Sequence, residues 1–425
     1  MCGILGIYSS KPNPIFETVQ RLRKLQHRGK DSWGISYFHQ GKIHTLKKKG
    51  MVEELTKQFP FVQQTIAHVR YTTSCENKED EIQPLTKRNI SIVHNGNIPI
   101  FQGHDTTKLF QMIDPDSNIE SSLIHIMDTI VASYSLLLMV DETLYVVKDR
   151  YGIRPLCIGE MDDKIIVSSE SCALQDCKMI REVQSGQILK IDRQGVHPIY
   201  LHPNNKDGIC IFEFIYFMNK DSIYRNQKIE TIRFQLGEIL AKKETFKDKG
   251  YLVIGVPSSG ISAALSYAKL LQFEYSQAIQ KVSQKTCDRT FIVMGHSERV
   301  QACKKKFKYD SQKIKNRKLI IIDDTIVRGN VIQSVINELK MMEPLEIHIR
   351  IPSPPVVDIC QLGIAIHSKE ELLMNNRSLS DVKEYLGVNS INYLTYEELS
   401  QFSPDSYKEC FGGGIDKDII SVEPS

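Results

Sequence analysis

Residues 319–330 read Leu-Ile-Ile-Ile-Asp-Asp-Thr-Ile-Val-Arg-Gly-Asn and constrain the fold more than any other stretch. The apolar, mostly β-branched run at 319–322 is typical of a strand buried on both faces of a parallel sheet. Two carboxylates, Asp323 and Asp324, follow at the carboxyl end of this strand, where open α/β sheets bind ligands. Apolar residues then recur at helical spacing over 330–341. The stretch predicts a central strand, a ligand-binding loop and a helix.

The loop between that strand and that helix has the features of a phosphate site. Backbone N–H groups at a helix start form an anion cradle, Gly329 permits close approach, and Thr325 offers a hydroxyl. Paired carboxylates beside such a cradle suit a sugar phosphate with Mg²⁺. For two aspartates alone, the simpler interpretation is a helix cap at Asp323 and a solvated charge at Asp324. The whole string therefore decides between the two interpretations.

The string resembles the 5-phosphoribosyl 1-diphosphate (PRPP) signature of type I phosphoribosyltransferases, particularly the amidophosphoribosyltransferase family. The resemblance implies a mostly parallel-sheet domain that binds PRPP. Ser259 follows a second apolar strand, predicted at 251–256, and would hold Mg²⁺ together with the two aspartates. The residues expected to bind PRPP are Asp323, Asp324, Thr325, Arg328, Gly329, Asn330 and Arg289.

Two features of this half depart from the family pattern. Ser258 stands where the family usually has an acidic residue, and residues 283–288 read Ser-Gln-Lys-Thr-Cys-Asp in place of Lys-Asn-Arg-Tyr-x-Gly. The family loop closes over PRPP. A protein that binds PRPP or nucleotides without catalysis therefore stays open as an alternative.

The chain begins Met1-Cys2-Gly3-Ile4. With Met1 removed, Cys2 would carry a free α-amine, with a reference pKa of about 7.7–8.0, beside a thiol with a pKa of about 8.5. The amine can then act as the general base for the thiol of the same residue. A core strand at 4–7 would hold this nucleophile in place.

Three further segments indicate the role of Cys2. Residues 25–35, 68–73 and 94–97, with later strings up to residue 174, resemble the class II glutamine amidotransferases. The resemblance implies a four-layer αββα fold with a catalytic N-terminal Cys2. It spans the first half of the chain.

Each matched position suits amide hydrolysis. Arg70 supplies a fork of donors for the carboxylate of a free amino acid, and the resemblance adds Thr73 as a second contact. The Asn95 side chain and the Gly96 N–H would stabilise the oxygen that gains charge when Cys2 attacks.

One position in this half differs from the family. Asn118 stands where the family has an Asp that holds the α-ammonium of glutamine, so glutamine should bind more weakly; Asp114 or Asp116 are candidate substitutes. An enzyme that uses only free ammonia stays open for this reason. Arg28 and Asp31 are expected either to support the nucleophile or to serve packing alone.

Length and composition agree with a two-domain protein. A chain of 425 residues exceeds one ordinary core and predicts two domains. The resemblance implies that these are an α+β glutaminase domain at 2–205 and an α/β phosphoribosyltransferase domain at 206–425. A net charge of +3 argues against nucleic acid as a partner. No apolar run reaches the roughly 18 residues of a membrane helix. Ten cysteines without a regular framework predict a reducing, cytoplasmic location.

Three cysteines fall on positions that bind an iron–sulfur cluster in one branch of the family. Cys210, Cys360 and Cys410 match three of these positions. The fourth thiolate is expected three residues before Cys410, where this chain has Tyr407. A [4Fe–4S] cluster normally needs four thiolates. Three buried, reduced cysteines are therefore predicted in preference to a cluster.

The combined resemblance implies a purine-biosynthesis glycosyltransferase. It would use glutamine, PRPP and Mg²⁺ to make 5-phosphoribosylamine, glutamate and pyrophosphate. Its partners would be these small molecules and, from the resemblance alone, further copies of the chain in a homo-oligomer.

Overall fold

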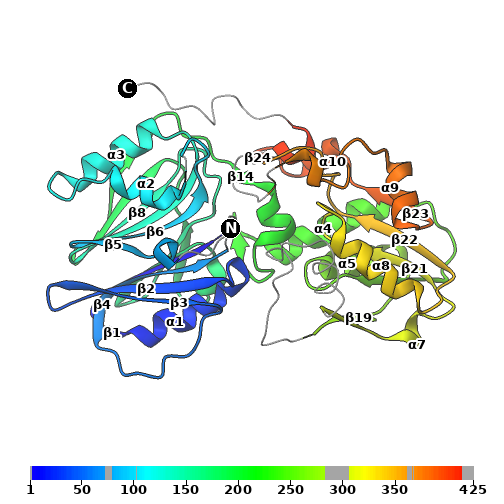
Figure 1. Cartoon of the computed structure of the whole chain (residues 1–425), viewed down its shortest axis with the longest axis horizontal. Coiled ribbons are helices and arrows are strands. Elements are labelled where there is room, and N and C mark those ends of the chain that lie inside the picture. The colour runs from blue at the N-terminus through cyan, green and yellow to red at the C-terminus, as the bar shows by residue number, and fades with distance from the viewer. Residues whose placement is uncertain are drawn as a thin grey trace.

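The computed structural model describes residues 2–71, 79–101, 103–282, 306–360, 366 and 368–413. Figure 1 shows two parts side by side: the blue and cyan elements form one, and the elements coloured from green to red form most of the other. Two antiparallel sheets lie within residues 3–201, and a parallel sheet lies within residues 251–393. The chain passes between them after β13 ends at Leu201, and the boundary between residues 205 and 206 stays a prediction.

The first part contains two large sheets. The seven-stranded sheet has the order β11-β9-β10-β1-β4-β2-β3, and the six-stranded sheet has the order β13-β12-β8-β7-β6-β5. The strands are β1 Gly3–Pro14, β2 Ser32–His39, β3 Lys42–Lys49, β4 Phe61–Arg70, β5 Leu85–Lys87, β6 Ile90–Asn97, β7 Ser133–Val140, β8 Thr143–Lys148, β9 Cys157–Glu160, β10 Lys164–Ser168, β11 Met179–Glu182, β12 Gln187–Asp192 and β13 Gly195–Leu201.

Alternation along the strands builds the layers of this part. Ile4 of β1 packs with Val93 of β6 in the core between the sheets, whereas its neighbour Leu5 packs with Val19 of helix α1. Successive strand residues face opposite sides, so one strand serves both cores. Helix α1 (Ile15–Lys24) covers the seven-stranded sheet, and α2 (Asp105–Gln111) and α3 (Ile119–Thr129) cover the six-stranded sheet. The predicted αββα architecture is confirmed.

The second part is built on a five-stranded parallel sheet. Its order is β18-β17-β21-β22-β23, so β21 is central, as predicted. The alternating residues of β21 enter two different cores: α4 and α5 pack on one face of the sheet, and α8 and α9 pack on the other. The elements are β17 Tyr251–Gly255, β18 Glu274–Tyr275, β21 Lys318–Ile322, β22 Glu346–Ile351, β23 Ser390–Tyr393, α4 Ile229–Lys242, α5 Gly260–Leu271, α8 Asn330–Lys340 and α9 Leu379–Leu386.

In the described residues, no helix has the length and apolar character needed to cross a bilayer.

Short elements connect and close the two parts. The remaining elements are β14 Ile209–Cys210, β15 Ile223–Tyr224, β16 Gln227–Lys228, β19 Ile279–Lys281, β20 Phe307–Tyr309, β24 Ser406–Tyr407, α7 Ser311–Ile314, α10 Tyr396–Phe402, the π-helical turn η4 Glu213–Phe217, and the 3₁₀ turns η1 Gln26–Arg28, η2 Glu79–Glu81, η3 Ser171–Ala173, η5 Lys369–Glu371 and η6 Glu409–Phe411.

Candidate active sites

Cys2 lies directly before β1 and is held by contacts to both sheets. Its backbone N–H donates to Asn95 Oδ1 over 3.1 Å. Two residues further, the N–H of Ile4 donates to Ser169 Oγ (2.9 Å), and the N–H of Ser169 donates to the Ile4 carbonyl (3.0 Å). Cys2 itself stays partly exposed. A thiol is thus fixed at the end of a buried strand and remains accessible to a substrate.

Asn95 lies on β6, opposite the thiol-bearing strand. Its carbonyl oxygen is engaged by Cys2, but its Nδ2 group is buried and has no hydrogen-bond partner among the described residues. A buried amide donor without a partner is costly, so such groups mark places where a ligand completes the site. Gly96 follows on the same strand, and a side chain there would collide with the Ser133 carbonyl oxygen. The structure thus places both predicted oxyanion residues on the strand that contacts Cys2.

Arg70 ends β4 and carries the second incomplete donor. Its Nη2 group donates to Glu81 Oε2, whereas its Nη1 group is buried without a partner among the described residues. One arm of a rigid fork therefore remains for an acceptor such as a carboxylate. The expected second contact, Thr73, lies outside the described residues.

The three positions considered for binding the α-ammonium of glutamine lie on the surface near α3. Asn118 is exposed and caps α3, where its Oδ1 accepts from the N–H of Glu120 over 2.9 Å. Asp116 is exposed and pairs with Arg88 at 2.6 Å. Asp114 is exposed and accepts from the N–H of Asp116. Their role in binding glutamine stays a prediction.

A carboxylate that the sequence analysis overlooked lies closer to the nucleophile. Asp105 begins α2, and its Oδ2 accepts from the N–H of Ile98 over 2.9 Å. Burial raises the pKa of this carboxyl to about 6, and the Cys2 thiolate adds a smaller contribution of the same sign. The position has no signal in the sequence beyond a polar residue at a helix start.

The two predicted supports lie next to the nucleophile and to Arg70. The Arg28 side chain is buried, and its Nε donates to the Cys2 carbonyl over 2.9 Å. Asp31 is also buried, and its N–H donates to the Arg70 carbonyl over 3.1 Å. Arg28 therefore acts directly on the residue that carries the thiol.

The second candidate site lies at the carboxyl edge of the parallel sheet. Asp323 and Asp324 follow β21 and are buried. Ser259, from the β17–α5 loop, donates its hydroxyl to Asp324 Oδ2. A side chain at Gly260 would collide with the Ile322 carbonyl oxygen, so this glycine lets the two loops approach. The structure thus brings together the three residues predicted to hold Mg²⁺.

The two aspartates are electrostatically strained in the free protein. Burial, together with the neighbouring Asp324 charge, raises the pKa of Asp323 well above its usual range. Burial also raises the pKa of Asp324 to about 6, against the opposing effect of the Ser259 hydrogen bond. A ligand that brings hydroxyl donors or positive charge relieves both effects. Mg²⁺ is typically held by one or two carboxylates and by substrate phosphates, so these residues fit it.

The loop after the aspartates has the predicted shape. Gly329 has a φ of 81°, in the left-handed region that glycine adopts most readily, and α8 starts at Asn330. Thr325 Oγ1 is buried without a partner among the described residues. Arg328 donates from Nε to Glu371 Oε2 over 2.6 Å, a pairing the sequence analysis did not foresee. The predicted PRPP contact Arg289 and the loop 283–288 lie outside the described residues.

Tyr71 contacts Cys2 and is also affected by the charge of Arg328 in the second part. The Tyr71 carbonyl lies 4.0 Å from Cys2 Sγ. Burial raises the pKa of the Tyr71 phenol to about 12; the Asp31 charge adds to this shift, and the charge of Arg328, in the loop between β21 and α8, opposes it. A residue that contacts the nucleophile is therefore within electrostatic reach of the second site.

The three family cysteines lie within electrostatic reach of one another. Burial raises the pKa of Cys210 to about 12, and each of Cys210 and Cys410 is affected by the charge of Cys360. Among the described residues, no group of three or more His, Cys, Asp or Glu side chains could hold a metal ion. At the fourth position, the Tyr407 ring packs against Gly208 and lies edge-on to Tyr151. An aromatic ring occupies the place of the missing ligand, so these residues do not fit a [4Fe–4S] cluster.

Comparisons with known proteins agree with both halves of this description. Residues 1–152 match the family model described as class-II glutamine amidotransferases. Over 94% of this chain, the amidophosphoribosyltransferases of Rattus norvegicus and Methanothermobacter thermautotrophicus are 32% and 31% identical, with 88% and 90% of their own lengths covered.

A solved structure resembles the whole chain. The glutamine PRPP amidotransferase from B. subtilis, complexed with ADP and GMP, is 28% identical and has a TM-score of 0.86 over 98% of this chain and 97% of its own. The alignments with these relatives therefore extend over both parts of the chain, and the solved structure has the same fold over both. The chain belongs to the amidophosphoribosyltransferase family.

Proposed function

We propose that this chain is a glutamine-dependent amidophosphoribosyltransferase that catalyses the first step of de novo purine synthesis. The observation that supports this most is the pair of incomplete donors beside Cys2. Asn95 Nδ2 and Arg70 Nη1 are both buried without a partner among the described residues. A free amino acid with a side-chain amide supplies a carboxylate for Arg70 and a developing oxyanion for Asn95.

The first reaction takes place at Cys2. Once Met1 is removed, the α-amine accepts the thiol proton, and the thiolate attacks the side-chain carbonyl of glutamine. Asn95 Nδ2 and the Gly96 N–H stabilise the oxyanion. The protonated α-amine returns its proton to the departing nitrogen, which leaves as ammonia, and water then hydrolyses the remaining thioester to glutamate and the free thiol. Arg28 holds the Cys2 carbonyl during these steps.

The second reaction takes place at the edge of the parallel sheet. Asp323 and Asp324 accept the ribose hydroxyls of PRPP, and the loop from Thr325 to Asn330 binds the 5-phosphate. Mg²⁺ held by the aspartates and Ser259 would neutralise charge on the pyrophosphate. Ammonia attacks C1 of the ribose as pyrophosphate departs, which gives 5-phosphoribosylamine. Passage of ammonia inside the protein keeps it unprotonated and nucleophilic.

A Cys2→Ala variant separates the two activities. We expect it to lose synthesis from glutamine and to keep synthesis from ammonium chloride at high pH. Cys177→Ala is the matched control, because this cysteine is partly buried away from Asn95 and should leave both activities unchanged. Glutamine-dependent synthesis by Cys2→Ala would overturn the proposed role of the thiol.

One observation favours a second candidate function. Asn118 brings no charge and is exposed, so the α-ammonium of glutamine lacks its usual partner there. An enzyme that works only with free ammonia would follow if glutamine does not bind. Wild-type protein that is active with ammonia and inactive with glutamine would select this candidate. A cytoplasmic location and a homo-oligomeric state are part of the proposal in either case.

A further inference from the structure

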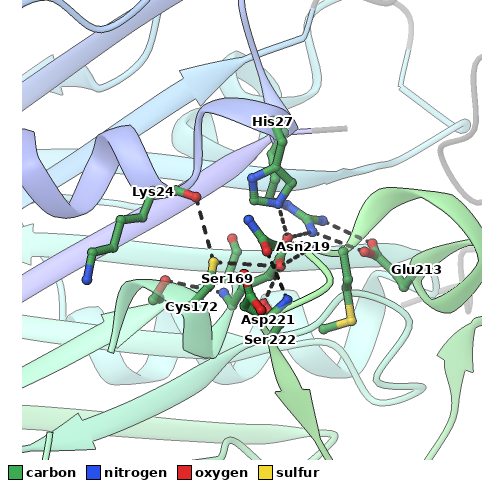
Figure 2. Close-up of polar contacts among 12 residues, drawn as sticks. Lys24, His27, Ser169, Cys172, Glu213, Asn219, Asp221 and Ser222 are labelled. Atoms are coloured by element: carbon green, nitrogen blue, oxygen red, sulfur yellow. Dashed lines mark hydrogen bonds and ion pairs between the residues drawn. The ribbon is translucent and has the colours of Figure 1, made fainter. Parts of the chain in front are cut away.

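Four buried charges meet at the boundary between the two parts of the chain. We call Arg28, Glu170, Arg154 and Glu213 the Arg28 cluster. Arg28 Nη1 donates to Glu170 Oε1 over 2.5 Å and to Glu213 Oε2 over 3.1 Å, and Arg28 Nη2 donates to Glu213 Oε1 over 3.0 Å. All four side chains have zero exposed surface. Figure 2 shows this region: His27 and Glu213 lie at its edge, Glu213 comes from a green segment, and dashed contacts run between them.

The cluster joins two positive and two negative side chains, and His27 Nε2 lies 2.7 Å from Glu170 Oε1 at its edge. Arg154 Nη1 lies 3.4 Å from Glu213 Oε1, so two guanidinium groups face two carboxylates. Burial alone would raise the pKa of Glu170, but the charges of His27 and Arg28 and its hydrogen bonds hold it well below the usual range. Burial would lower the pKa of Arg28, yet the two carboxylates raise it above its ordinary value. Removal of one carboxylate leaves an excess positive charge in a dry site.

This cluster sets the orientation of the nucleophile. The guanidinium of Arg28 is planar, and its Nε donates to the Cys2 carbonyl over 2.9 Å. Its two Nη groups are fixed by Glu213 on one side and Glu170 on the other. The carboxylates therefore determine the plane of the guanidinium, and the guanidinium determines the position of the Cys2 carbonyl.

Glu213 belongs to a segment that is anchored to α4 through Arg233. It begins η4, and two carbonyls of this segment, those of Phe214 and Met218, accept from Arg233 over 2.8 Å each. Arg233 lines a small cavity together with Ser259 and Asp324 of the PRPP site. The segment that carries Glu213 thus lies between the nucleophile and the second site.

We propose that Glu213 is a positioning residue for Cys2, so that the glutaminase centre is complete only when the η4 segment of the second part is docked. The inference rests on the proposed glutaminase function. It adds that a residue outside the glutaminase half, and 211 positions from the nucleophile in sequence, sets how productively the thiol is presented.

The test compares two variants of the full chain with a matched control. Glu213→Gln keeps the size of the side chain and removes its charge, whereas Glu213→Asp keeps the charge and shortens the side chain. The control is Ser171→Ala, because Ser171 Oγ accepts from the N–H of Ile223 (2.7 Å) and donates to its carbonyl (3.1 Å). This control removes a contact between the parts without touching Arg28.

Kinetics and labelling are both measured. We expect Glu213→Gln to lower kcat for glutamine at least about tenfold, with KM for glutamine within about twofold of wild type. Glu213→Asp should recover part of the loss, and ammonia-dependent synthesis should not change. The rate at which iodoacetamide alkylates Cys2, followed by mass spectrometry from pH 6 to 9, should change in Glu213→Gln and match wild type in Ser171→Ala. Cys177 serves as the internal reference.

The outcomes separate this inference from the proposed function. Wild-type protein without glutaminase activity would contradict the proposed function, and the alkylation profiles would still test Glu213 because they need no glutamine. Equal kcat and equal alkylation profiles for wild type and Glu213→Gln would overturn the inference. So would an equal loss in Ser171→Ala, because the effect would then come from general loosening of the boundary. Thermal unfolding of each variant identifies any that fail to fold, and Glu213→Asp then carries the test.

Discussion

The backbone N–H of Cys2 donates to Asn95 Oδ1 over 3.1 Å, which joins the start of one sheet to a strand of the other. The same contact turns the Asn95 amide so that its Nδ2 group is left buried and unpartnered among the described residues. One hydrogen bond thus fixes both the proposed nucleophile and the proposed donor for the oxyanion.

Asn95→Ala should lower kcat for glutamine by about 10² to 10³, the usual effect of losing one oxyanion donor. Ammonia-dependent synthesis should be unaffected, because the second site is not touched. Asn89→Ala is the control, since Asn89 precedes the same strand and only bonds Asp141 at the surface. Steady-state assays with both nitrogen donors check the prediction, and an equal loss with both donors would contradict it.

Asn118→Asp should lower KM for glutamine, because it places a negative charge for the α-ammonium at the N-terminus of α3. The change should not destabilise the protein, since Asp is an equally good N-cap and a negative charge is favourable at a helix start. Asp162→Asn, which removes an exposed pair with Lys178 and has no predicted role in binding glutamine, is the control. An unchanged KM would show that position 118 only caps the helix.

Asp324→Asn should abolish synthesis and raise stability. The pKa of Asp324 is raised to about 6 in the folded protein, so its ionisation weakens the fold progressively as pH rises from about 4 to 6. Asn avoids this cost, which amounts to at most about 3 kcal/mol above pH 6. Thermal unfolding from pH 4.5 to 8 should show a gain in Tm that is complete at high pH and small at low pH.

Asp248→Asn provides a control of opposite sign. Hydrogen bonds from Gly250 and Lys318 lower the pKa of Asp248, so its charge stabilises the fold above the unfolded pKa and this effect is lost as pH falls. The substitution should therefore lower Tm at neutral pH. A drop in Tm for Asp324→Asn at pH 8 would contradict the strain assigned to the aspartate pair.

Anaerobically purified protein should contain no stoichiometric iron and no absorbance from an iron–sulfur cluster. The Tyr407 hydroxyl donates to the Tyr151 carbonyl over 3.3 Å, and its ring fills the fourth ligand position. Titration with a thiol reagent after unfolding should find Cys210, Cys360 and Cys410 reduced. Four irons per chain in the purified protein would contradict this account.

The sequence was informative where a pattern reflects local physics. The apolar run of β21, the glycine at 329 and the helix from Asn330 each follow from period and backbone preference, and all three are observed. The αββα layers and the main candidate residues came from the family resemblance, because no periodicity specifies how two sheets stack.

Contacts between distant residues were not predictable. Arg28 and Glu213 are 185 positions apart, and Arg328 and Glu371 pair across a loop between different elements. Glu213 did leave one trace: it is the single charge within the apolar run 211–217, which is typical of a buried, paired carboxylate. The identity of its partner required the fold.

The most direct test of the account is one assay that follows glutamate and pyrophosphate together. Pure wild-type protein is incubated with glutamine, PRPP and Mg²⁺, and each substrate is then left out in turn. The account predicts equal amounts of glutamate and pyrophosphate, with no pyrophosphate when both glutamine and ammonia are absent. Glutamate release that is never accompanied by pyrophosphate, or the absence of both products, would contradict it.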